Sequence, residues 1–435
     1  MNSPFETRIE KLVYGGDGLA HHEGTTVFVP YVLPGERVLM EPVQQQKKFV
    51  RGRATEILEA SAERVPAPCP RFGVCGGCHY QHMPYEAQVR YKTEILRETL
   101  ARIGKIEWPG EIAAHASPAF GYRNRAQWAV RPVGDPPKPA IGYFQSASST
   151  LAPTEVCPIL APELESVLGA VAAAFAAEKL HGSIRAIECF AGFPDGRLLL
   201  NIAVTRGGPA GTKLAEQFRE IVPNIESLLF QAEGTENFEL IGPGYVQYEA
   251  ASFRYRVGHL SFFQVNRFIV DDLIRAVAGP AATIGWNHGL AVDLYAGVGL
   301  FSTALASRFE RVIAVEGNVA TARDLDANLK EVPAARARHA DTESFLARCK
   351  ETPDLVVLDP PRAGVPAKAL QRLREIAPPQ ITYLSCDPAT LARDLAALTG
   401  SSGSGARYQI NTITLYDIFP QTYHIEALVQ LQRLG

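Results

Sequence analysis

The chain has 435 residues, of which 46% are hydrophobic and 20% charged, and its formal net charge is -3. At roughly 150 residues per domain, this length predicts two to four globular domains. No apolar run reaches the ~20 residues of a membrane-spanning helix, which excludes an integral helical membrane protein. Residues 1–12 carry charges and lack the apolar core of a secretory signal, so we expect a cytoplasmic protein.

Residues 1–60 are expected to form a small all-β domain. Turn clusters at 15–18, 21–24 and 33–36 separate short β-prone runs. The order Asp-Gly-Leu-Ala, Val-Phe-Val-Pro, Leu-Pro-Gly-Glu and then a basic segment, Lys47–Arg53, resembles the TRAM domain, an RNA-binding barrel of RNA-modifying enzymes. The basic segment can bind phosphates despite the acidic net charge, although a solvated surface is the alternative.

Three cysteines follow in a Cys-x5-Cys-x2-Cys run, which consists of Cys69, Cys75 and Cys78. A two-residue gap lets neighbouring thiolates reach one centre, and the glycines between them let the backbone wrap around it. Cys157 is the candidate fourth ligand. A cytosolic enzyme rarely uses four such cysteines as disulfides, so we expect a metal centre. The spacing alone leaves zinc and iron-sulfur open.

Residues 61–255 are expected to form a central domain of mixed α+β structure. Tyr85–Ile103 is predicted to be a helix, and alternating segments at 184–190 and 197–205 predict an inserted sheet. Arg123 and Arg125 are expected on one face of a strand, where they either clamp RNA phosphates or are simply solvated.

Residues 256–435 change to strands that alternate with helices, which predicts a doubly wound, Rossmann-like parallel sheet. The expected strands are Leu290–Tyr295, Arg311–Val315, Asp354–Leu358, Ile381–Leu384, Tyr408–Leu415 and Ile425–Gln432. The expected fold class is therefore α/β at the C-terminus, with a small N-terminal β-barrel and a central α+β domain.

The first of these strands runs from Asp293 through Tyr295 into a Gly-Val-Gly turn, where a ligand can approach the backbone. Glu316 ends the next strand, and a carboxylate there can accept both hydroxyls of a ribose. Together these features predict a nucleoside-bearing cofactor. The third glycine of dinucleotide-binding dehydrogenases is missing, which favours S-adenosylmethionine over a phosphate-bearing cofactor.

Three further motifs lie at or near strand ends. Asp359 opens Asp-Pro-Pro-Arg, which is typical of methyltransferases that act on nucleobases, and Gln264 stands in Ser-Phe-Phe-Gln-Val-Asn just before the sheet. Cys386 follows the strand Ile381–Leu384 in a polar turn. A polar turn is a poor place for an inert thiol, so Cys386 is a candidate nucleophile, with a buried packing cysteine as the alternative.

Jointly these motifs resemble the RNA uracil-5-methyltransferase family, and the barrel and cysteine run are similar to its 23S ribosomal-RNA branch. The likeness includes Ser385-Cys-Asp-Pro-Ala-Thr and the C-terminal Phe419-Pro-Gln-Thr-Tyr-His-Ile-Glu426. It implies a four-iron four-sulfur (4Fe-4S) cluster on the four cysteines, with Cys386 as nucleophile and Glu426 as base. By matching motifs, it implies contacts to S-adenosylmethionine from Gln264, Tyr295, Glu316, Asp341 and Asp359.

The chemistry explains why Cys386 and Glu426 are needed. Uracil C5 is a weak nucleophile, but addition of a thiolate to C6 makes C5 enolate-like, so that it can take a methyl group from a sulfonium. A base must then remove the C5 proton before the cysteine leaves. The target uracil must also leave its stack, and Phe263 is the expected aromatic platform.

We therefore expect a monomeric, cytoplasmic enzyme that methylates C5 of a specific uridine in folded RNA. The expected substrate is 23S ribosomal RNA, with neither a membrane nor a protein partner. Because methyl transfer needs no electron, the cluster is expected to be structural. The rivals are the same reaction on transfer RNA, a non-catalytic RNA-binding iron-sulfur protein, and an amino-methyltransferase that uses Asp359-Pro-Pro.

Overall fold

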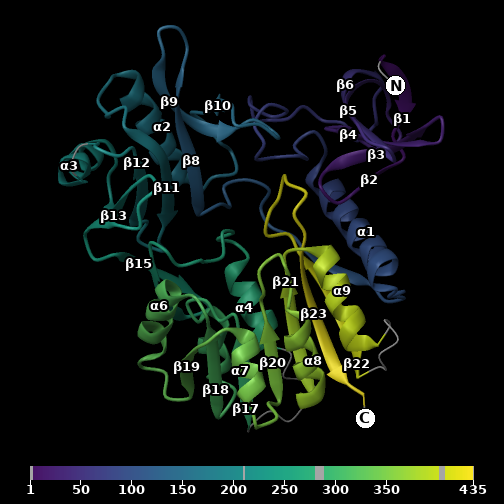
Figure 1. Ribbon diagram of the computed structural model, residues 1–435, viewed down its shortest axis with the longest axis vertical. Coiled ribbons are helices and arrows are strands. Elements are labelled where there is room, and N and C mark those ends of the chain that lie inside the picture. The colour runs from purple at the N-terminus through teal and green to yellow at the C-terminus, as the bar shows by residue number, and fades with distance from the viewer. Residues whose placement is uncertain (1–2, 209–210, 280–288, 401–406, 435) are drawn as a thin grey trace.

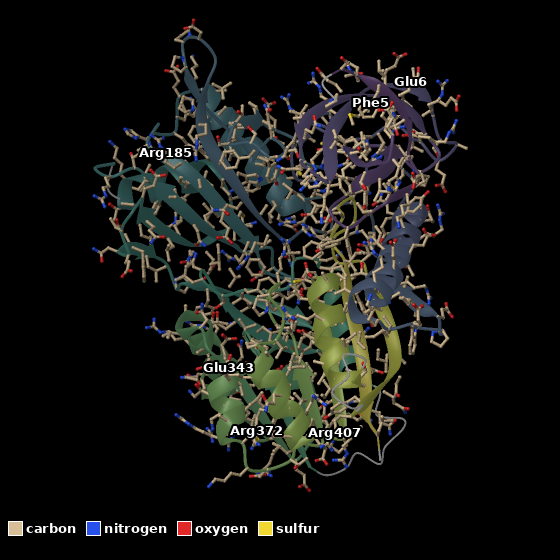
Figure 2. The ribbon with its side chains drawn as sticks, turned by 45° about the vertical axis from the view of Figure 1, so that its right-hand side comes forward. Phe5, Glu6, Arg185, Glu343, Arg372 and Arg407 are labelled. Atoms are coloured by element: carbon tan, nitrogen blue, oxygen red, sulfur yellow. The ribbon has the colours of Figure 1, made fainter. Side chains whose placement is uncertain are left out.

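The computed structural model describes residues 3–208, 211–279, 289–400 and 407–434. Within these ranges the strands pair into sheets of six, seven, two and eight strands. Figure 1 shows three bodies: an N-terminal β-domain in purple, a central domain in teal, and a C-terminal domain in green and yellow. Figure 2 marks them from another side, with Phe5 on the first, Arg185 on the second and Arg372 on the third.

The N-terminal β-domain is the six-stranded sheet, in the order β1-β5-β6-β4-β3-β2. Its strands are β1 (Phe5–Arg8), β2 (Lys11–Leu12), β3 (Asp17–His22), β4 (Thr25–Pro30), β5 (Arg37–Gln45) and β6 (Phe49–Glu59). Alternate residues, such as Val27 and Val29 on β4 and Val38 and Met40 on β5, are buried in a core of their own. This period of two is what a half-buried strand requires.

The central domain is the seven-stranded sheet, in the order β10-β9-β8-β11-β12-β13-β14. Its elements are β8 (Arg125–Val133), β9 (Lys138–Phe144), β10 (Leu151–Pro153), α2 (Pro162–Ala176), β11 (Ile184–Ala191), β12 (Leu198–Val204), α3 (Gly211–Ile221), β13 (Ile225–Ala232) and β14 (Phe238–Ile241). Helix α2 buries Leu164, Val167, Leu168 and Val171, whose spacing places them on one helical face. A hairpin, β15 (Tyr245–Ala250) with β16 (Phe253–Gly258), leads to the next domain.

The C-terminal domain is an eight-stranded sheet with helices on both faces, in the order β19-β18-β17-β20-β21-β23-β22-β7. Its strands are β7 (Ile112–His115), β17 (Leu290–Leu294), β18 (Arg311–Glu316), β19 (Ala335–His339), β20 (Leu355–Leu358), β21 (Gln380–Ser385), β22 (Tyr408–Tyr416) and β23 (Glu426–Arg433). Its helices are α4 (Val270–Ala278), α5 (Leu300–Leu305), α6 (Val319–Leu329), α7 (Thr342–Arg348), α8 (Ala367–Ile376) and α9 (Pro388–Thr399).

The expected parallel sheet is present, but it is mixed at one side. Strands β19, β18, β17, β20 and β21 are parallel, whereas β23 runs antiparallel to β21. All five residues of β17 are buried, as expected for a strand covered on both faces. From β17 the chain first adds β18 and β19 on one side and then β20 and β21 on the other, so the strand order reverses between β17 and β20. In α/β sheets, ligands bind at the carboxyl ends of the two strands at such a switch point.

A segment from the central part of the chain completes this domain. Strand β7 pairs in parallel with β22, and helix α1 (Tyr85–Gly104) packs against α9. Sequence patterning did not reveal β7, because four residues alone carry too little periodicity. Among the described helices, none is long and apolar enough to cross a membrane.

Helix α1 also holds the connection between β22 and β23, which rises in yellow between the other two domains in Figure 1. Lys92 Nζ donates to Asp417 Oδ1 at 2.6 Å and to the Phe419 carbonyl at 2.9 Å, and both side chains of the ion pair are fully buried. One turn earlier, Gln88 exchanges two 2.9 Å hydrogen bonds with Gln421. The Lys92 hydrogen bonds offset part of the cost of burying this pair, although Asp417 Oδ2 has no partner among the described residues.

Breaking this ion pair should destabilise the C-terminal domain strongly. Lys92→Met leaves Asp417 buried without its cation, which costs about 3–5 kcal/mol of the free energy of unfolding, measured by urea denaturation. Arg102→Met, which breaks an exposed pair with Glu98 on the same helix, should cost less than about 1 kcal/mol. The double variant Lys92→Met/Asp417→Leu should recover most of the lost stability. Equal losses for Lys92→Met and Arg102→Met would contradict this account.

Candidate active site

The turn after β17 joins two of the residues predicted to bind a cofactor. Tyr295 has a φ of 65°, and Gly299, with a φ of 90°, precedes α5. A Cβ at Gly299 would meet Leu325 Cδ1 at 2.9 Å, so glycine is needed there for both space and conformation. Gly297 N donates to Glu316 Oε2 at 2.9 Å, which ties the turn of Tyr295 to the end of β18.

A cavity of about 360 Å³ opens beside Glu316, at the carboxyl ends of β18 and β19. It is lined by Glu316, Gly317, Val319, Ala322, Arg323, His339 and Ala340. Asp341 is the next residue along the chain, but its Oδ1 accepts a 2.8 Å hydrogen bond from Ser344 N and caps α7. This bond lowers the pKa of Asp341. The cavity has the size of a small-ligand site.

Two acidic residues lie at the switch point between β17 and β20. Asp293 is fully buried on β17, and Asp359 directly follows β20. Burial raises the pKa of each to about 7, and the charge of Asp293 adds to the shift of Asp359. Asp293 Oδ2 accepts from the Ser302 hydroxyl, whereas Oδ1 has no partner among the described residues. A positively charged ligand nearby would lower both raised pKa values, because it stabilises the ionised carboxylates.

Gln264 lies on the segment between β16 and α4 and is 7% exposed. Its backbone carbonyl accepts from Asn124 Nδ2 at 3.1 Å, and Val265 O accepts from Asn124 N at 2.9 Å. These bonds attach the segment to the start of β8. In the part of the chain that the structure describes, no hydrogen bond links the Gln264 side chain to Asp293 or Asp359.

Strand register brings Cys386 and Glu426 together. In the antiparallel pairing of β21 with β23, Ser385 lies opposite Ala427. Cys386 is the residue after Ser385 and Glu426 the residue before Ala427, so the same register places them opposite each other. Glu426 is 5% exposed, and Cys386 is half-buried. The sequence motifs predicted both residues, and the sheet supplies their proximity.

The electrostatic surroundings keep the Cys386 thiol protonated in the free protein. Burial, with the charges of Glu426 and Asp359, raises the pKa of Cys386 to about 12, while the positive charge of Arg362 opposes the shift. Burial and the charge of Asp359 also hold the pKa of Glu426 well above its usual range, again opposed by Arg362. Arg362 is therefore the cation that favours the charged forms of both groups.

Two further residues border the nucleophile turn. Tyr14, in the turn between β2 and β3, donates to Asp387 Oδ2 at 3.3 Å, and Asp387 Oδ1 caps α9. Arg362 Nη2 lies 3.3 Å from His424 Nδ1. Burial lowers the pKa of His424 to about 3, so this imidazole is neutral at pH 7. The N-terminal β-domain thus reaches the residue next to Cys386.

Two of the predictions from sequence were wrong. Phe263 is 2% exposed and packs against Tyr248 at a ring distance of 4.5 Å, so it belongs to the core and cannot serve as a platform for a base. Its neighbour Phe262 is 60% exposed. Arg125 is not a solvated residue of a strand face, because its side chain is only 15% exposed, its Nη1 donates to Ser261 O at 2.6 Å and its guanidinium stacks on Phe190. These contacts engage the guanidinium within the protein instead of leaving it free to clamp a phosphate.

Four of the cysteines line one cavity of about 410 Å³. Cys69, Cys75, Cys78 and Cys157 are all free thiols, and Arg123 lines the same cavity. Burial raises the pKa of Cys78 to about 12 and that of Cys157 to about 11. Within the described residues, no three His, Cys, Asp or Glu side chains are grouped closely enough to hold a single metal ion. The four thiols thus line one cavity, whereas the expected metal centre is not shown among the described residues.

Several residues of the site escaped sequence reasoning. The role of Lys92 could have been predicted, because it lies on the buried face of α1 between Gln88 and Ile95. A charged residue at such a position needs a partner of opposite charge. Tyr14 carried no such sign, since its contact with Asp387 joins residues 373 positions apart. Arg362 was visible as part of Asp-Pro-Pro-Arg, but its electrostatic role depends on the folded sheet.

Alkylation of Cys386 should report its raised pKa. Because only the thiolate reacts, the rate of modification by iodoacetamide should rise about tenfold per pH unit from pH 7 to 9 without a plateau. Glu426→Gln removes a charge that raises the pKa and should accelerate the reaction, whereas Arg362→Gln should slow it. Mass spectrometry of the Cys386 peptide gives the rate. The exposed Glu375→Gln is the control, and a plateau below pH 9 would contradict the raised pKa.

Comparisons with known proteins show the family of the chain. A family described as tRNA (Uracil-5-)-methyltransferase matches residues 335–434. The chain is 34% identical to a 23S rRNA (uracil(1939)-C(5))-methyltransferase RlmD from Halomonas elongata, over 98% of this chain and 89% of that protein. It is 32% identical to an uncharacterized RNA methyltransferase from Streptomyces avermitilis, over 99% of both chains.

A solved structure shares the architecture. It is the tRNA (uracil-54, C5)-methyltransferase of Pyrococcus abyssi in complex with S-adenosyl-L-homocysteine, which matches with a TM-score of 0.75 over 98% of this chain and 100% of that one. At 24% sequence identity, this likeness establishes the α/β methyltransferase fold. From the sequence relatives and the matched family, the chain belongs to the RNA uracil-5-methyltransferase family of enzymes.

Proposed function

We propose that this enzyme transfers a methyl group from S-adenosylmethionine to C5 of a specific uridine in 23S ribosomal RNA. The observation that carries the proposal is the β21–β23 register, which sets a thiol and a buried carboxyl group opposite each other at a strand end. Uracil C5 methylation needs a nucleophile for C6 and a base for the C5 proton. Cys386 and Glu426 supply these groups.

The choice of ribosomal RNA rests on the relative from Halomonas elongata, whose name specifies 23S rRNA and which matches over nearly the whole chain. Transfer RNA is the second candidate, because the matched family and the Pyrococcus abyssi structure are both named for it. The N-terminal β-domain, which we propose to be an RNA-binding TRAM domain, favours the first substrate. We infer that Phe262, with its exposed ring, replaces Phe263 as the platform for the extruded base.

The residues at the switch point fit S-adenosylmethionine. When bound, this cosubstrate supplies an electrophilic methyl group on a positively charged sulfur. The unpartnered Asp293 Oδ1 and the raised pKa of Asp359 mark a place where positive charge is favourable. Glu316 uses both oxygens on backbone amides but retains lone pairs for ribose hydroxyls. We propose Gln264, Tyr295, Glu316, Asp341 and Asp359 as the cosubstrate-binding residues.

The proposed reaction starts at the Cys386 sulfur. The thiol gives its proton to solvent, the sulfur bonds to C6, and the C5–C6 electron pair moves towards the O4 carbonyl. C5 then takes the methyl group, and its sulfonium carrier leaves as a neutral thioether. Glu426 removes the C5 proton, the double bond re-forms, and the C6–sulfur bond breaks to release Cys386. Arg362 assists because its charge favours both the thiolate and the ionised carboxylate.

We propose that the four cysteines hold a structural 4Fe-4S cluster. Support comes from the shared cavity and from the donor set of four free thiols. Each thiolate of such a cluster bonds its own iron atom, so the four sulfurs stand farther apart than around one ion. Cluster binding would cross-link the loop of Cys69–Cys78 to Cys157, and the proposed methyl transfer needs no electron from it.

Methyl transfer to unmodified 23S ribosomal RNA and to unmodified transfer RNA, assayed side by side, tests the substrate. With labelled S-adenosylmethionine, we expect label in 5-methyluridine from the ribosomal RNA only. Nucleoside analysis of the digested RNA gives the result. Label in 5-methyluridine from transfer RNA alone would overturn the substrate, and label in a methylated amino group would overturn the reaction.

Substitutions of Cys386 and Glu426 should block the reaction at different steps. Cys386→Ser should lower turnover by at least about 10³-fold and form no adduct, because the covalent step is lost. Glu426→Gln should instead accumulate an RNA–protein adduct, because addition and methylation proceed but the C5 proton remains. Denaturing gel electrophoresis with labelled RNA separates the outcomes. An adduct with Cys386→Ser would remove Cys386 from its proposed role.

Iron analysis tests the cluster. Protein purified without oxygen should contain about four iron atoms and four sulfide ions per chain. Cys157→Ser should lower this content, while Cys349→Ser, which changes a cysteine outside the cavity, should not. Zinc in place of iron, or equal metal content in both variants, would contradict the assignment.

A further inference from the structure

A third cavity, of about 500 Å³, lies where the three domains meet. Its wall includes parts of the N-terminal β-domain, the end of β9 and the β22–β23 connection. It also includes part of residues 69–78, the loop that carries three of the cysteines and is called the cysteine loop below. It is lined by Gly15, Asp17, Pro30, Tyr31, Arg51, Gly76, Gly77, His79, Tyr143, Phe144, Gln145, Ser146, Ala147 and Tyr423. None of the residues assigned above to methyl transfer lines it.

The wall has the composition of a site for a nucleobase. Tyr31, Phe144 and Tyr423 offer aromatic rings, and Phe144 is 38% exposed. The Tyr31 ring is held edge-on against Phe72 at 5.2 Å, so its orientation is fixed before any ligand arrives. His79 Nδ1 is buried and has no hydrogen-bond partner among the described residues. Stacking rings with a few polar groups are how proteins bind unpaired bases.

The wall also carries one cation placed for a phosphate. Arg51 on β6 is 56% exposed in its side chain, and its Nη2 lies 2.7 Å from Asp17 Oδ2. This pair neutralises the acidic side chain within the cavity. A guanidinium has five donor hydrogens, so Arg51 can keep Asp17 and bind a phosphodiester as well.

Side-chain contacts link the cavity wall to the nucleophile turn. Tyr423 lines the cavity and meets Tyr14 edge-on at a ring distance of 5.7 Å. Tyr14 precedes the lining residue Gly15 and hydrogen-bonds to Asp387, the residue after Cys386. Tyr14 therefore connects a residue of the cavity wall to the residue beside Cys386. A strand of RNA whose target base lies at Cys386 would bring a neighbouring nucleotide to this cavity.

The cysteine loop forms a shared wall between the two cavities. Gly76 N donates to Phe144 O at 3.0 Å, and Ser146 N donates to Val74 O at 3.2 Å. A Cβ at Gly76 would meet the Ser146 Cα at 3.2 Å, so a side chain there would press on this close backbone contact. Gly76 and His79 line both cavities. The position of Phe144 is thereby tied to the loop that carries the cysteines.

We propose that this cavity binds an unpaired nucleotide of the RNA substrate that neighbours the target uridine in sequence. The base stacks on Phe144 and Tyr31, and its phosphate contacts Arg51. This inference rests on the proposed function, since it takes RNA as the substrate and Cys386 as the position of the target base. It assigns to the junction of the three domains a part in selecting which uridine is methylated.

A double-mutant cycle between protein and RNA tests the proposal. Full-length wild type and Phe144→Ala are assayed on a synthetic 23S RNA fragment that contains the target uridine. They are also assayed on fragments with one abasic residue at each of the two positions on either side. Phe144→Ala should raise KM by about 5- to 100-fold, the range expected for one lost stacking contact, with kcat changed less than about twofold.

At one flanking position the abasic fragment should raise the wild-type KM by a similar factor, and Phe144→Ala should add nothing further there. Phe238→Ala is the matched control, because Phe238 is 53% exposed on β14 at the opposite edge of the same sheet. An unchanged KM for Phe144→Ala, or independent effects at every position, would overturn the proposal. Absence of 5-methyluridine with wild type on the intact fragment would instead count against the proposed function.

The phosphate contact has its own readout. Arg51→Gln should weaken RNA binding and lower the slope of log Kd against log salt concentration by about one. Arg311→Gln is the control, since Arg311 is also exposed and ion-paired, with Glu351, but lies on β18 and does not line the cavity. Equal slopes for the two variants would remove Arg51 from the proposed site.

Discussion

A buried ion pair between Lys92 and Asp417 fixes the segment on which the rest of the site depends. Asp417 begins the connection that returns to the sheet as β23, and β23 begins at Glu426. With the Gln88–Gln421 bonds, the pair holds this connection against α1, so that Glu426 enters the sheet opposite Cys386. The geometry of the proposed chemistry thus follows from a contact between residues 325 positions apart.

The second constraint is the concentration of acidic groups at the strand ends. Asp293, Asp359 and Glu426 all have raised pKa values because burial penalises their charged forms. Such a site is costly in the free protein and becomes favourable when a cation enters, as a sulfonium cosubstrate would. The exposed Arg362 balances this acidity near Cys386. Ligand binding can therefore change the protonation states of Glu426 and Cys386.

Features that depend on residues close together in the chain could be predicted from the sequence, whereas those that depend on distant residues could not. The Rossmann-like strands, the α1 helix and the motif residues Cys386, Glu426 and Asp359 follow from local patterns, and the structure places them at one edge of the sheet. Phe263 was misassigned because two adjacent phenylalanines outside regular structure give no sign of which ring faces the core. Arg125 was misassigned because the pattern of β8 does not show that Ser261 and Phe190, which are distant in sequence, contact its guanidinium. Strand β7 and Tyr14 were missed because their partners lie hundreds of residues away, where no local pattern records them.

The most direct test of the central claim is mass spectrometry of the complex formed with RNA that carries 5-fluorouridine at the target position. Fluorine at C5 cannot be removed as a proton, so the reaction should stop after methyl transfer with the enzyme still bonded to C6. The account predicts an S-adenosylmethionine-dependent adduct whose RNA mass maps to the Cys386 peptide. An adduct on another residue, or none while ordinary RNA is methylated at C5, would contradict Cys386 as the nucleophile.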